Sequence, residues 1–330
     1  RDSLVQSSYS RLFDNIRRSG EMSEEMQRLA AEPASQTPKA SMHGLGLEQT
    51  PDVFVLVVES YGAALLDEPI LSGPYRQNMV SLQERLAESG YKTYSNRSRS
   101  PVVGGLSWQA TSTILSGIQI GNQHIYSKLA DTGAYGLPQF FSDHRYQTWT
   151  IQPGFRTRPG RPVSNPWGYQ NTLYFEELNY HGERWGWGVV PDQYALGRGL
   201  QALHASPGGP NFLMFTGVST HAPWDKIPEF RQDWESFGRN PEGTKDSSGV
   251  WRKLMSKLSG QKSSCVSLSC YQDAIEQEWL VLADFMEQVS SPAALFVVVG
   301  DHQPPIVSTQ DSHVPIHFIA RGVEGLPRLE

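Results

Sequence analysis

The chain has 330 residues, of which 38% are hydrophobic and 11% aromatic, so it can build a substantial core and is not a disordered chain. Its formal net charge is -6, and no run of Lys and Arg marks a surface for phosphate backbones, which argues against a nucleic-acid partner. No apolar run approaches the roughly 18 residues that a membrane-spanning helix needs.

The first 50 residues differ in composition from the rest of the chain. Their apolar side chains recur at helical spacing and are followed by a proline-containing linker at 32–38. We therefore predict a helical segment and linker over 1–50, whose apolar face packs on the domain or, alternatively, lies on a membrane surface. The chain opens at Arg1 without a signal segment, which favours a piece cut from a longer protein.

From residue 51 to 330, strand-like and helix-like segments alternate, as in one large α/β domain. Strands are predicted at 53–58, 91–94, 147–151, 211–217, 294–299 and 315–320. Helical stripes are predicted over 79–86 and 275–289. This alternation predicts an α/β fold with a mostly parallel central sheet and helices on both faces. The irregular stretches 153–190 and 225–270 are predicted to be loops over this scaffold.

The two cysteines, Cys265 and Cys270, lie close together in a polar stretch. This spacing favours a small surface disulfide and hence an oxidising compartment, with two unpaired thiols as the alternative.

Ionisable side chains follow three of the predicted strands. Glu59 follows the first strand, His221 follows 211–217, and Asp301 and His302 follow 294–299. Each alone has a structural interpretation as a loop residue, a helix cap or a hydrogen-bonding histidine. Because the carboxyl ends of parallel strands share one edge of a sheet, we expect the four groups to gather there. Together they favour a functional site, with metal binding and acid–base chemistry both open.

A candidate nucleophile, Ser107, stands at the start of a predicted helix, after the glycines at 104–105. The structural alternative is a helix cap, whereas the free N–H groups of a helix start also attract an anion such as a phosphoryl group. Serine is a poor nucleophile until its proton is removed or a metal binds its oxygen. Since no Gly-x-Ser-x-Gly elbow is present, the metal route is favoured over a Ser-His-Asp triad.

Taken in order, a strand ending in Glu-Ser at 59–60, a glycine turn with Ser107, the strand end with His221, and Gly-Asp-His at 300–302 resemble the alkaline phosphatase superfamily. The resemblance covers about residues 51–322. It is closest to the sulfatase-like, membrane-anchored phosphotransferases, namely lipoteichoic acid synthases and phosphoglycerol transferases, with phosphoethanolamine transferases more distant.

The resemblance implies one divalent metal ion, Mn²⁺ or Zn²⁺. Its four implied ligands are Glu59, Ser107, Asp301 and His302. Ser107 stands in the nucleophile position, with Thr111 or Ser112 as alternatives in register. His221 matches a histidine on the substrate side, near the leaving group.

The substrate half of the site is implied by two further matches. Arg161 matches an arginine that contacts the phosphate, with Arg156 or Arg158 as alternatives in register. The aromatic residue expected just before this arginine is missing, which leaves the transferred headgroup open. His313 resembles in placement a secondary histidine on the metal side, the alternative being a surface loop histidine.

The implied activity is transfer of a phospholipid headgroup, phosphoglycerol or phosphoethanolamine, through phospho-Ser107 to a hydroxyl of a glycan or lipid. The resemblance places the domain on the extracytoplasmic face of a bacterial membrane, periplasmic or extracellular, with an anchor before Arg1. A metal-dependent phosphodiesterase and an inactive binding module are the alternatives. An ordinary sulfatase is disfavoured, because the formylglycine signature of Cys or Ser followed by x-Pro-x-Arg is missing.

Overall fold

The structure is a computed structural model that describes residues 47, 49–132, 135–157, 164–206, 208–239 and 265–323. The predicted N-terminal helix and linker fall almost entirely outside these residues, as do Arg158 and Arg161. None of the helices in the described ranges combines the length and the apolar character that crossing a bilayer requires.

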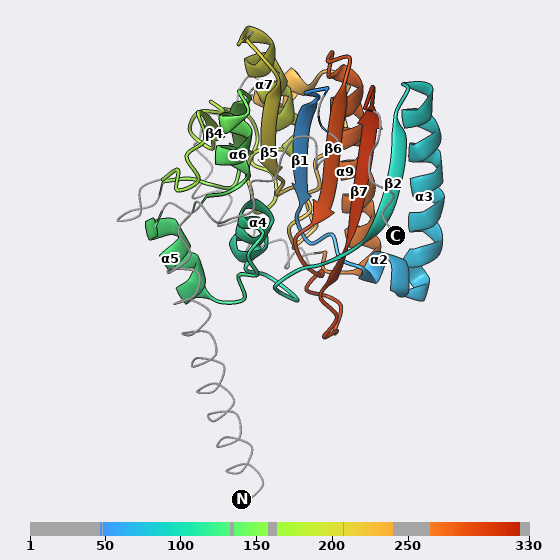
Figure 1. Cartoon of the computed structure of the whole chain (residues 1–330). Coiled ribbons are helices and arrows are strands. Elements are labelled where there is room, and N and C mark those ends of the chain that lie inside the picture. The colour runs from blue at the N-terminus through green and yellow to red at the C-terminus, as the bar shows by residue number, and fades with distance from the viewer. Residues whose placement is uncertain are drawn as a thin grey trace, which may run out of the picture.

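Within the described ranges, seven strands form one sheet in the order β2-β7-β6-β1-β5-β3-β4 (Figure 1). They are β1 (Asp52–Val58), β2 (Lys92–Arg99), β3 (Gln147–Gln152), β4 (Asn171–Tyr174), β5 (Asn211–Thr216), β6 (Ala294–Gly300) and β7 (His313–Arg321). β1 pairs in parallel with β5 and β6, and β3 pairs in parallel with β4 and β5. β7 is antiparallel to both β2 and β6, because the link from β6 to β7 contains no crossover helix. The predicted mostly parallel α/β sheet is thus confirmed.

Helices cover both faces of the sheet, as predicted (Figure 1). They are α2 (Ala64–Asp67), α3 (Pro69–Glu88), α4 (Ser107–Ser116), α5 (Gln123–Thr132), α6 (Leu137–Asp143), α7 (Asp192–Ala205), the 3₁₀ helix η1 (Trp234–Gly238) and α9 (Leu268–Gln288). Alternate residues of β1 point to opposite faces. Phe54 and Leu56 pack in the core with α3, α7 and α9, whereas Val55 and Val57 pack in the core with α4 and α6.

Several segments of the fold differ from the sequence prediction, among them the helices α2, α5, α6 and η1, which were not predicted. β4 lies inside 153–190, which were predicted to be loops, and its four residues pair with β3 at the edge of the sheet. α7 was not predicted, because its buried residues include Asp192 and Gln193 and two glycines, which obscure an apolar stripe. The predicted disulfide between Cys265 and Cys270 is present.

The aromatic centre of the larger core joins β1 and β6. The rings of Phe54 and Phe296 stack with centroids 4.6 Å apart, and Phe285 of α9 meets both rings edge-on. Phe296→Ala is therefore expected to lower the free energy of unfolding by about 3–5 kcal/mol, measured by urea denaturation. Val80→Ala is the control, because this side chain on α3 is 57% exposed. An equal effect of both substitutions would contradict this account of the core.

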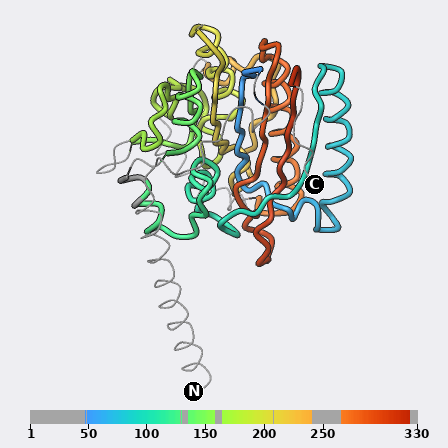
Figure 2. Tube along the Cα trace, viewed as in Figure 1, coloured from blue at the N-terminus to red at the C-terminus, as the bar shows by residue number. Residues whose placement is uncertain are grey.

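The strand register places the ends of β1, β5 and β6 side by side, although they are far apart in sequence (Figure 2). Val58 pairs with Gly300 at the ends of β1 and β6, and Val57 pairs with Thr216 of β5. Glu59 and Asp301 each follow one member of the first pair. Parallel register therefore brings these two carboxyl groups together.

Candidate active site

Four predicted residues meet at this edge of the sheet. One ligand atom from each of Glu59, Asp301 and His302 lies within 4.8 Å of those of the other two, and all three residues are buried. Ser107 Oγ donates a hydrogen bond to Glu59 Oε2 at 2.9 Å and lies 3.2 Å from His302 Nε2. The proposed metal ligands thus form one compact group of oxygen and imidazole donors.

Asp301 has one fully bonded oxygen and one without a partner. Its Oδ1 accepts hydrogen bonds from the backbone N–H groups of Ser60 and His302, both at 2.7 Å. Its Oδ2 is buried without a hydrogen-bond partner, and His302 Nε2 lies 3.4 Å from it. Because an unpaired buried carboxylate oxygen costs free energy, this atom is suited to a cation.

His302 is oriented as a metal ligand would be. Its Nδ1 lies 2.8 Å from the carbonyl oxygen of Gln303 and can donate to it, so that Nε2, 3.2 Å from Glu59 Oε1, is the ring nitrogen that faces the proposed metal ligands. Gln303 in turn accepts from Ala64 N and donates to the carbonyl oxygen of His313. A Cβ atom on Gly62 would clash with Gln303, so this close approach requires glycine.

The three ionisable groups shift one another's pKa values. Burial favours the neutral form of Glu59, but the hydrogen bond and charge of His302 outweigh it and lower the Glu59 pKa to about 2. Burial opposes the charged form of His302, yet Glu59 and Asp301 raise the His302 pKa to about 9. Burial and the charge of Glu59 raise the Asp301 pKa well above its ordinary value. The two buried carboxyl groups, Glu59 and Asp301, thus stabilise a positive charge between them, whether on His302 or on a bound metal ion.

Strained backbone precedes Ser107. Gly105 and Leu106 both have left-handed φ angles, 63° and 59°, and so does Ser60 at 57°. Such a conformation is unfavourable for Leu and Ser, and residues held this way cluster at functional sites. The turn delivers Ser107 to the start of α4, where Thr111 Oγ1 donates to the carbonyl oxygen of Ser107.

The alternative nucleophiles are placed differently from Ser107. Thr111 and Ser112 also line the cleft, yet the hydroxyl of Thr111 is bonded to the helix backbone. Only Ser107 of these three has a hydrogen bond to Glu59 within the described structure. This geometry favours Ser107.

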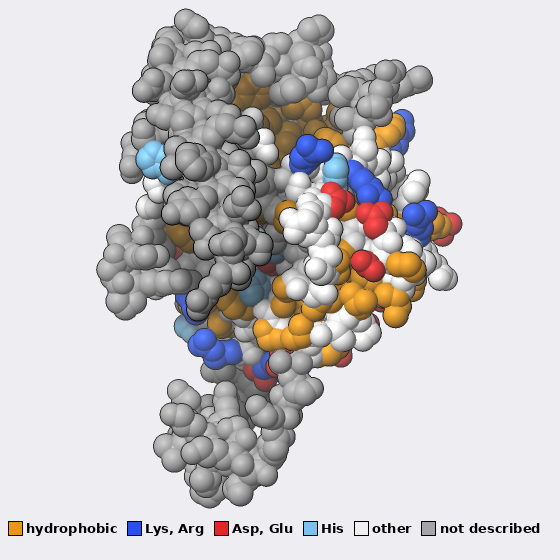
Figure 3. Space-filling view, turned by 90° about the horizontal axis from the view of Figure 1, so that it is seen from below, with side chains coloured by type: hydrophobic (Ala, Val, Ile, Leu, Met, Phe, Trp, Pro, Cys, Tyr) orange, Lys and Arg blue, Asp and Glu red, His pale blue; other side chains and the backbone are white. Residues whose placement is uncertain are grey.

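A cleft of about 470 Å³ opens above the metal-ligand group. Its aromatic lining comprises Trp108, Tyr126, Phe155, Trp167, Tyr169, Tyr174 and Trp187. Figure 3 views this edge of the molecule from below and shows hydrophobic side chains exposed beside a group of charged ones. His221 lines the same cleft; its Nδ1 lies 2.5 Å from the Ala222 carbonyl oxygen, and its ring stacks on Trp187 at 4.5 Å and 15°. The stack and the hydrogen bond fix the ring and leave Nε2 as the nitrogen available for a further contact.

The predicted arginines and His313 are not among the described residues that line the cleft. Arg161 lies outside the described residues, and Arg156 is half-buried. His313 Nδ1 pairs with Asp311 at 2.5 Å. The structure thus places the metal half of the predicted site together and leaves the substrate half as a prediction.

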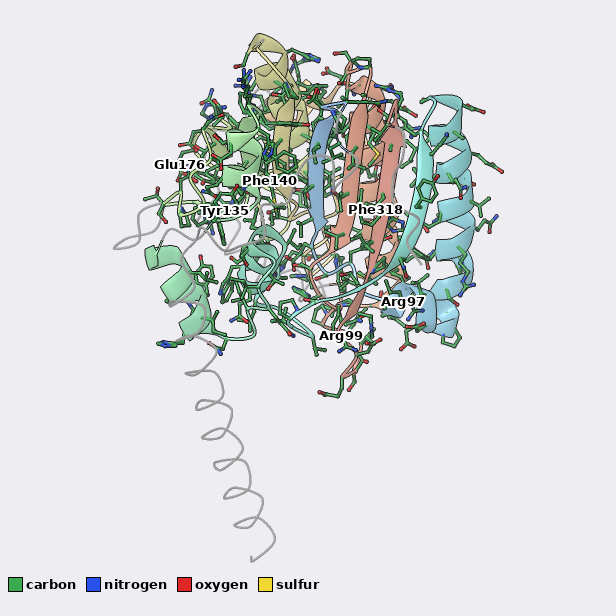
Figure 4. The ribbon with its side chains drawn as sticks, viewed as in Figure 1. Arg97, Arg99, Tyr135, Phe140, Glu176 and Phe318 are labelled. Carbon is green, nitrogen blue, oxygen red and sulfur yellow. A yellow bond between two sulfur atoms is a disulfide. The ribbon has the colours of Figure 1, made fainter. Side chains whose placement is uncertain are left out.

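Two further arginines lie at the same edge of the sheet. Figure 4 shows Arg97 and Arg99 at the end of β2. Arg97 forms a bidentate pair with Asp67, and neither arginine lines the cleft. They do not replace the predicted phosphate-binding arginine.

Three supporting residues escaped the sequence analysis. Thr220 Oγ1 donates to the carbonyl oxygen of Glu59 at 2.6 Å, and Tyr271 Oη donates to that of Ser60 at 2.7 Å. Trp187 stacks on His221. Thr220 and the cleft-lining Trp187 lie in stretches that the sequence had marked, whereas Tyr271 comes from α9, where nothing in the local pattern points to the site.

A sequence model of the sulfatase family matches residues 51–320. The chain belongs to this family. The match covers nearly the whole described domain and confirms the resemblance to the alkaline phosphatase superfamily, and with it the prediction of an enzyme. No curated protein matches the sequence.

Solved structures with the same fold include proteins whose names place them in the predicted branch. Lipoteichoic acid synthase LtaP from Listeria monocytogenes is 14% identical with a TM-score of 0.55, covering 86% of this chain and 68% of its own. Streptococcus pyogenes phosphoglycerol transferase GacH, in complex with sn-glycerol-1-phosphate, is 13% identical with a TM-score of 0.54, covering 94% and 76%. The periplasmic domain of Escherichia coli EptC, in complex with Zn, is 14% identical with a TM-score of 0.50, covering 83% and 74%. At these identities the likeness shows the fold.

Proposed function

We propose that this chain transfers a phospholipid headgroup, phosphoglycerol or phosphoethanolamine, through phospho-Ser107 to a hydroxyl of a glycan or lipid. The observation that carries the proposal is the position of Ser107 Oγ at a helix start, within hydrogen-bond distance of both Glu59 and His302. The fold shared with a lipoteichoic acid synthase and a phosphoglycerol transferase supports the same reaction class.

The site fits a single divalent cation. Glu59, Ser107, Asp301 and His302 would hold it, and the unpaired Asp301 Oδ2 supplies an oxygen ligand that no protein donor uses. Hard oxygens with one imidazole suit Mn²⁺ or Zn²⁺. A cation bound there would lower the pKa of the Ser107 hydroxyl and offset negative charge on the phosphoryl oxygens.

In the first half-reaction, Ser107 Oγ attacks phosphorus, a P–O bond to serine forms, and the P–O bond to diacylglycerol breaks. The hydrogen bond that Ser107 donates to Glu59 orients its oxygen, and the serine proton passes to water. His221 Nε2 protonates the departing diacylglycerol oxygen. In the second half-reaction, an acceptor hydroxyl attacks phospho-Ser107 and gives its proton to His221, the P–O bond to serine breaks, and the released Ser107 oxygen takes a proton from water.

The remaining substrate roles follow the sequence predictions. Arg161 would bind the non-bridging phosphate oxygens, as a guanidinium does well, and His313 would lie on the metal side. The aromatic cleft would hold the headgroup and adjacent parts of the substrates. We place the domain on the extracytoplasmic face of a bacterial membrane, held by an anchor before Arg1, and the Cys265–Cys270 disulfide supports an oxidising compartment.

Mass spectrometry of the protein tests the proposal directly. After incubation with Mn²⁺ or Zn²⁺ and phosphatidylglycerol or phosphatidylethanolamine, we expect a headgroup phosphate adduct on the peptide that contains Ser107, because a ping-pong reaction leaves the enzyme loaded when no acceptor is present. A Ser107→Ala sample is the control. Metal-loaded protein without an adduct from either lipid would refute the transferase, and rapid headgroup release without an acceptor would indicate a hydrolase.

A further inference from the structure

Two carboxylic acids are buried together behind the loop that carries His221. Asp192 begins α7 and is 1% exposed, and Glu278 lies within α9 and is 3% exposed. α7 packs against α9, Glu278 lines a small cavity with Gln193 and Ser219, and the two carboxyl groups are near enough to shift each other's pKa values. Throughout the described ranges, no ion pair links either group to a Lys, Arg or His. Since two buried carboxylates without a cation cannot both be ionised, the pair retains a proton.

The surroundings of the two groups decide where that proton lies. Asp192 accepts from Val218 N at 3.0 and 2.8 Å, through its two oxygens, and from Ser219 N at 2.9 Å. Glu278 Oε1 has no hydrogen-bond partner. Backbone N–H donors stabilise the ionised form of a carboxyl group, so the charge belongs on Asp192 and the proton on Glu278. The pKa values agree: burial and then Asp192 raise that of Glu278 well above its ordinary value, while burial raises that of Asp192 only to about 7.

Asp192 fixes the first half of the loop from 217 to 221. Besides accepting the two N–H groups, it donates its own N–H to Ser219 Oγ at 2.9 Å. A Cβ atom on Gly217 would lie 2.7 Å from Asp192 Oδ2, so the close approach requires glycine. Val218 fills the space beside Gly154 and Gly188, where added Cβ atoms would collide with it.

The second half of the same loop enters the active site. Thr220 holds the carbonyl oxygen of Glu59, and His221 lines the cleft against Trp187. Thr220 and His221 directly follow Val218 and Ser219 in the chain. A change in the hydrogen bonds of Val218 and Ser219 is therefore expected to move the His221 ring in the cleft.

We propose that Glu278 and Asp192 form a proton-sharing positioning pair, in which protonated Glu278 donates to ionised Asp192, and Asp192 holds Val218 and Ser219 so that His221 faces the cleft. The catalytic importance of His221 rests on the function proposed above. The position of the proton on Glu278 and the hydrogen bonds from Asp192 to the loop do not depend on that proposed function.

Two matched amide substitutions test the place of the proton. Glu278→Gln keeps a donor towards Asp192, whereas Asp192→Asn presents an NH₂ group to the N–H groups of Val218 or Ser219. Because a buried donor left unpaired is costly, we expect Asp192→Asn to raise the unfolding equilibrium constant on the order of 100-fold at pH 7, and Glu278→Gln by less than about threefold. Urea denaturation measures both constants. The reverse order, or equal effects, would overturn the assignment.

The pH dependence of unfolding gives a second test. Asp192 is the one titratable group in the described structure that shifts Glu278. A folded-state pKa above that of the unfolded chain means that the folded protein binds the extra proton, so this stabilisation is full at low pH and declines as pH rises above the ordinary Glu pKa of 4.5. Between about pH 5 and pH 8, the unfolding constant of the natural protein should rise relative to that of Glu278→Gln by up to about tenfold per pH unit. A ratio independent of pH would show that Glu278 holds no proton.

The positioning role is tested by turnover of the phospholipid donor with metal bound. We expect Asp192→Asn to lower kcat about 10–100-fold with little change in KM, and Glu278→Gln to preserve both. In a His221→Ala background, Asp192→Asn should cause no further loss. An unchanged kcat in a folded Asp192→Asn variant would reduce the pair to a structural role and overturn the proposal. If the natural protein does not use the donor at all, the proposed function fails, while both unfolding tests still decide the proton's place.

Discussion

Replacing Ser107 with Ala is expected to lower kcat for headgroup transfer on the order of 10⁴-fold, because it removes the oxygen that forms the covalent bond to phosphorus. The backbone of α4 places residue 107 at the helix start beside the cleft, and alanine preserves that backbone while it removes the hydroxyl and its hydrogen bond to Glu59. The thermal midpoint of the metal-free protein should therefore change far less than turnover. Metal affinity should fall as well, because Ser107 is one of the four proposed ligands, so turnover is compared at saturating metal. Steady-state kinetics with a lipid donor, calorimetric metal titration and thermal unfolding measure the three quantities.

Ser116→Ala is the matched control for this prediction. Ser116 lies in the last turn of the same helix, where its hydroxyl donates to the carbonyl oxygen of Ser112. It should retain nearly full activity. If Ser107→Ala stays active and a phosphate adduct appears on Thr111 or Ser112 instead, the register of the nucleophile turn is wrong and the site must be reassigned.

Asp301→Asn is expected to weaken divalent metal binding on the order of 100-fold or more. Asparagine keeps an Oδ1 acceptor for the N–H groups of Ser60 and His302 but replaces the unpaired Oδ2 with an NH₂ group, which cannot bind a cation. Loss of an outer hydrogen bond alone typically costs about 10–100-fold in metal affinity, so loss of a direct ligand should cost at least as much. Calorimetric titration with Mn²⁺ or Zn²⁺ measures the affinity.

The same substitution should not destabilise the metal-free protein. Without metal, the raised pKa of Asp301 keeps it neutral beside Glu59, and asparagine is neutral too, so the thermal midpoint of the metal-free protein should stay about equal. Asp311→Asn is the control, because this half-buried carboxylate pairs with His313 away from the cleft, and it should leave metal affinity unchanged. Unchanged affinity in Asp301→Asn would exclude Asp301 from the metal site. A loss in Asp311→Asn instead would move the site towards His313.

The sequence by itself determined which strands are followed by candidate site residues. Apolar runs at 53–58 and 294–299 are long enough to be buried strands, and parallel strands share one carboxyl edge, so Glu59, Asp301 and His302 had to meet if the fold was α/β. Ser107 could be added because a glycine turn before a helix is a local signal. These inferences need only the order of residues and the geometry of a regular element.

Only the tertiary structure decided how these groups are held. Tyr271 reaches Ser60 from 211 positions away, and Glu278 meets Asp192 through the packing of α9 against α7. The antiparallel course of β7 depends on the partners that it finds in space. Local propensity carries no information about such contacts, because hydrogen bonds and shared protons between distant segments depend on how whole elements pack.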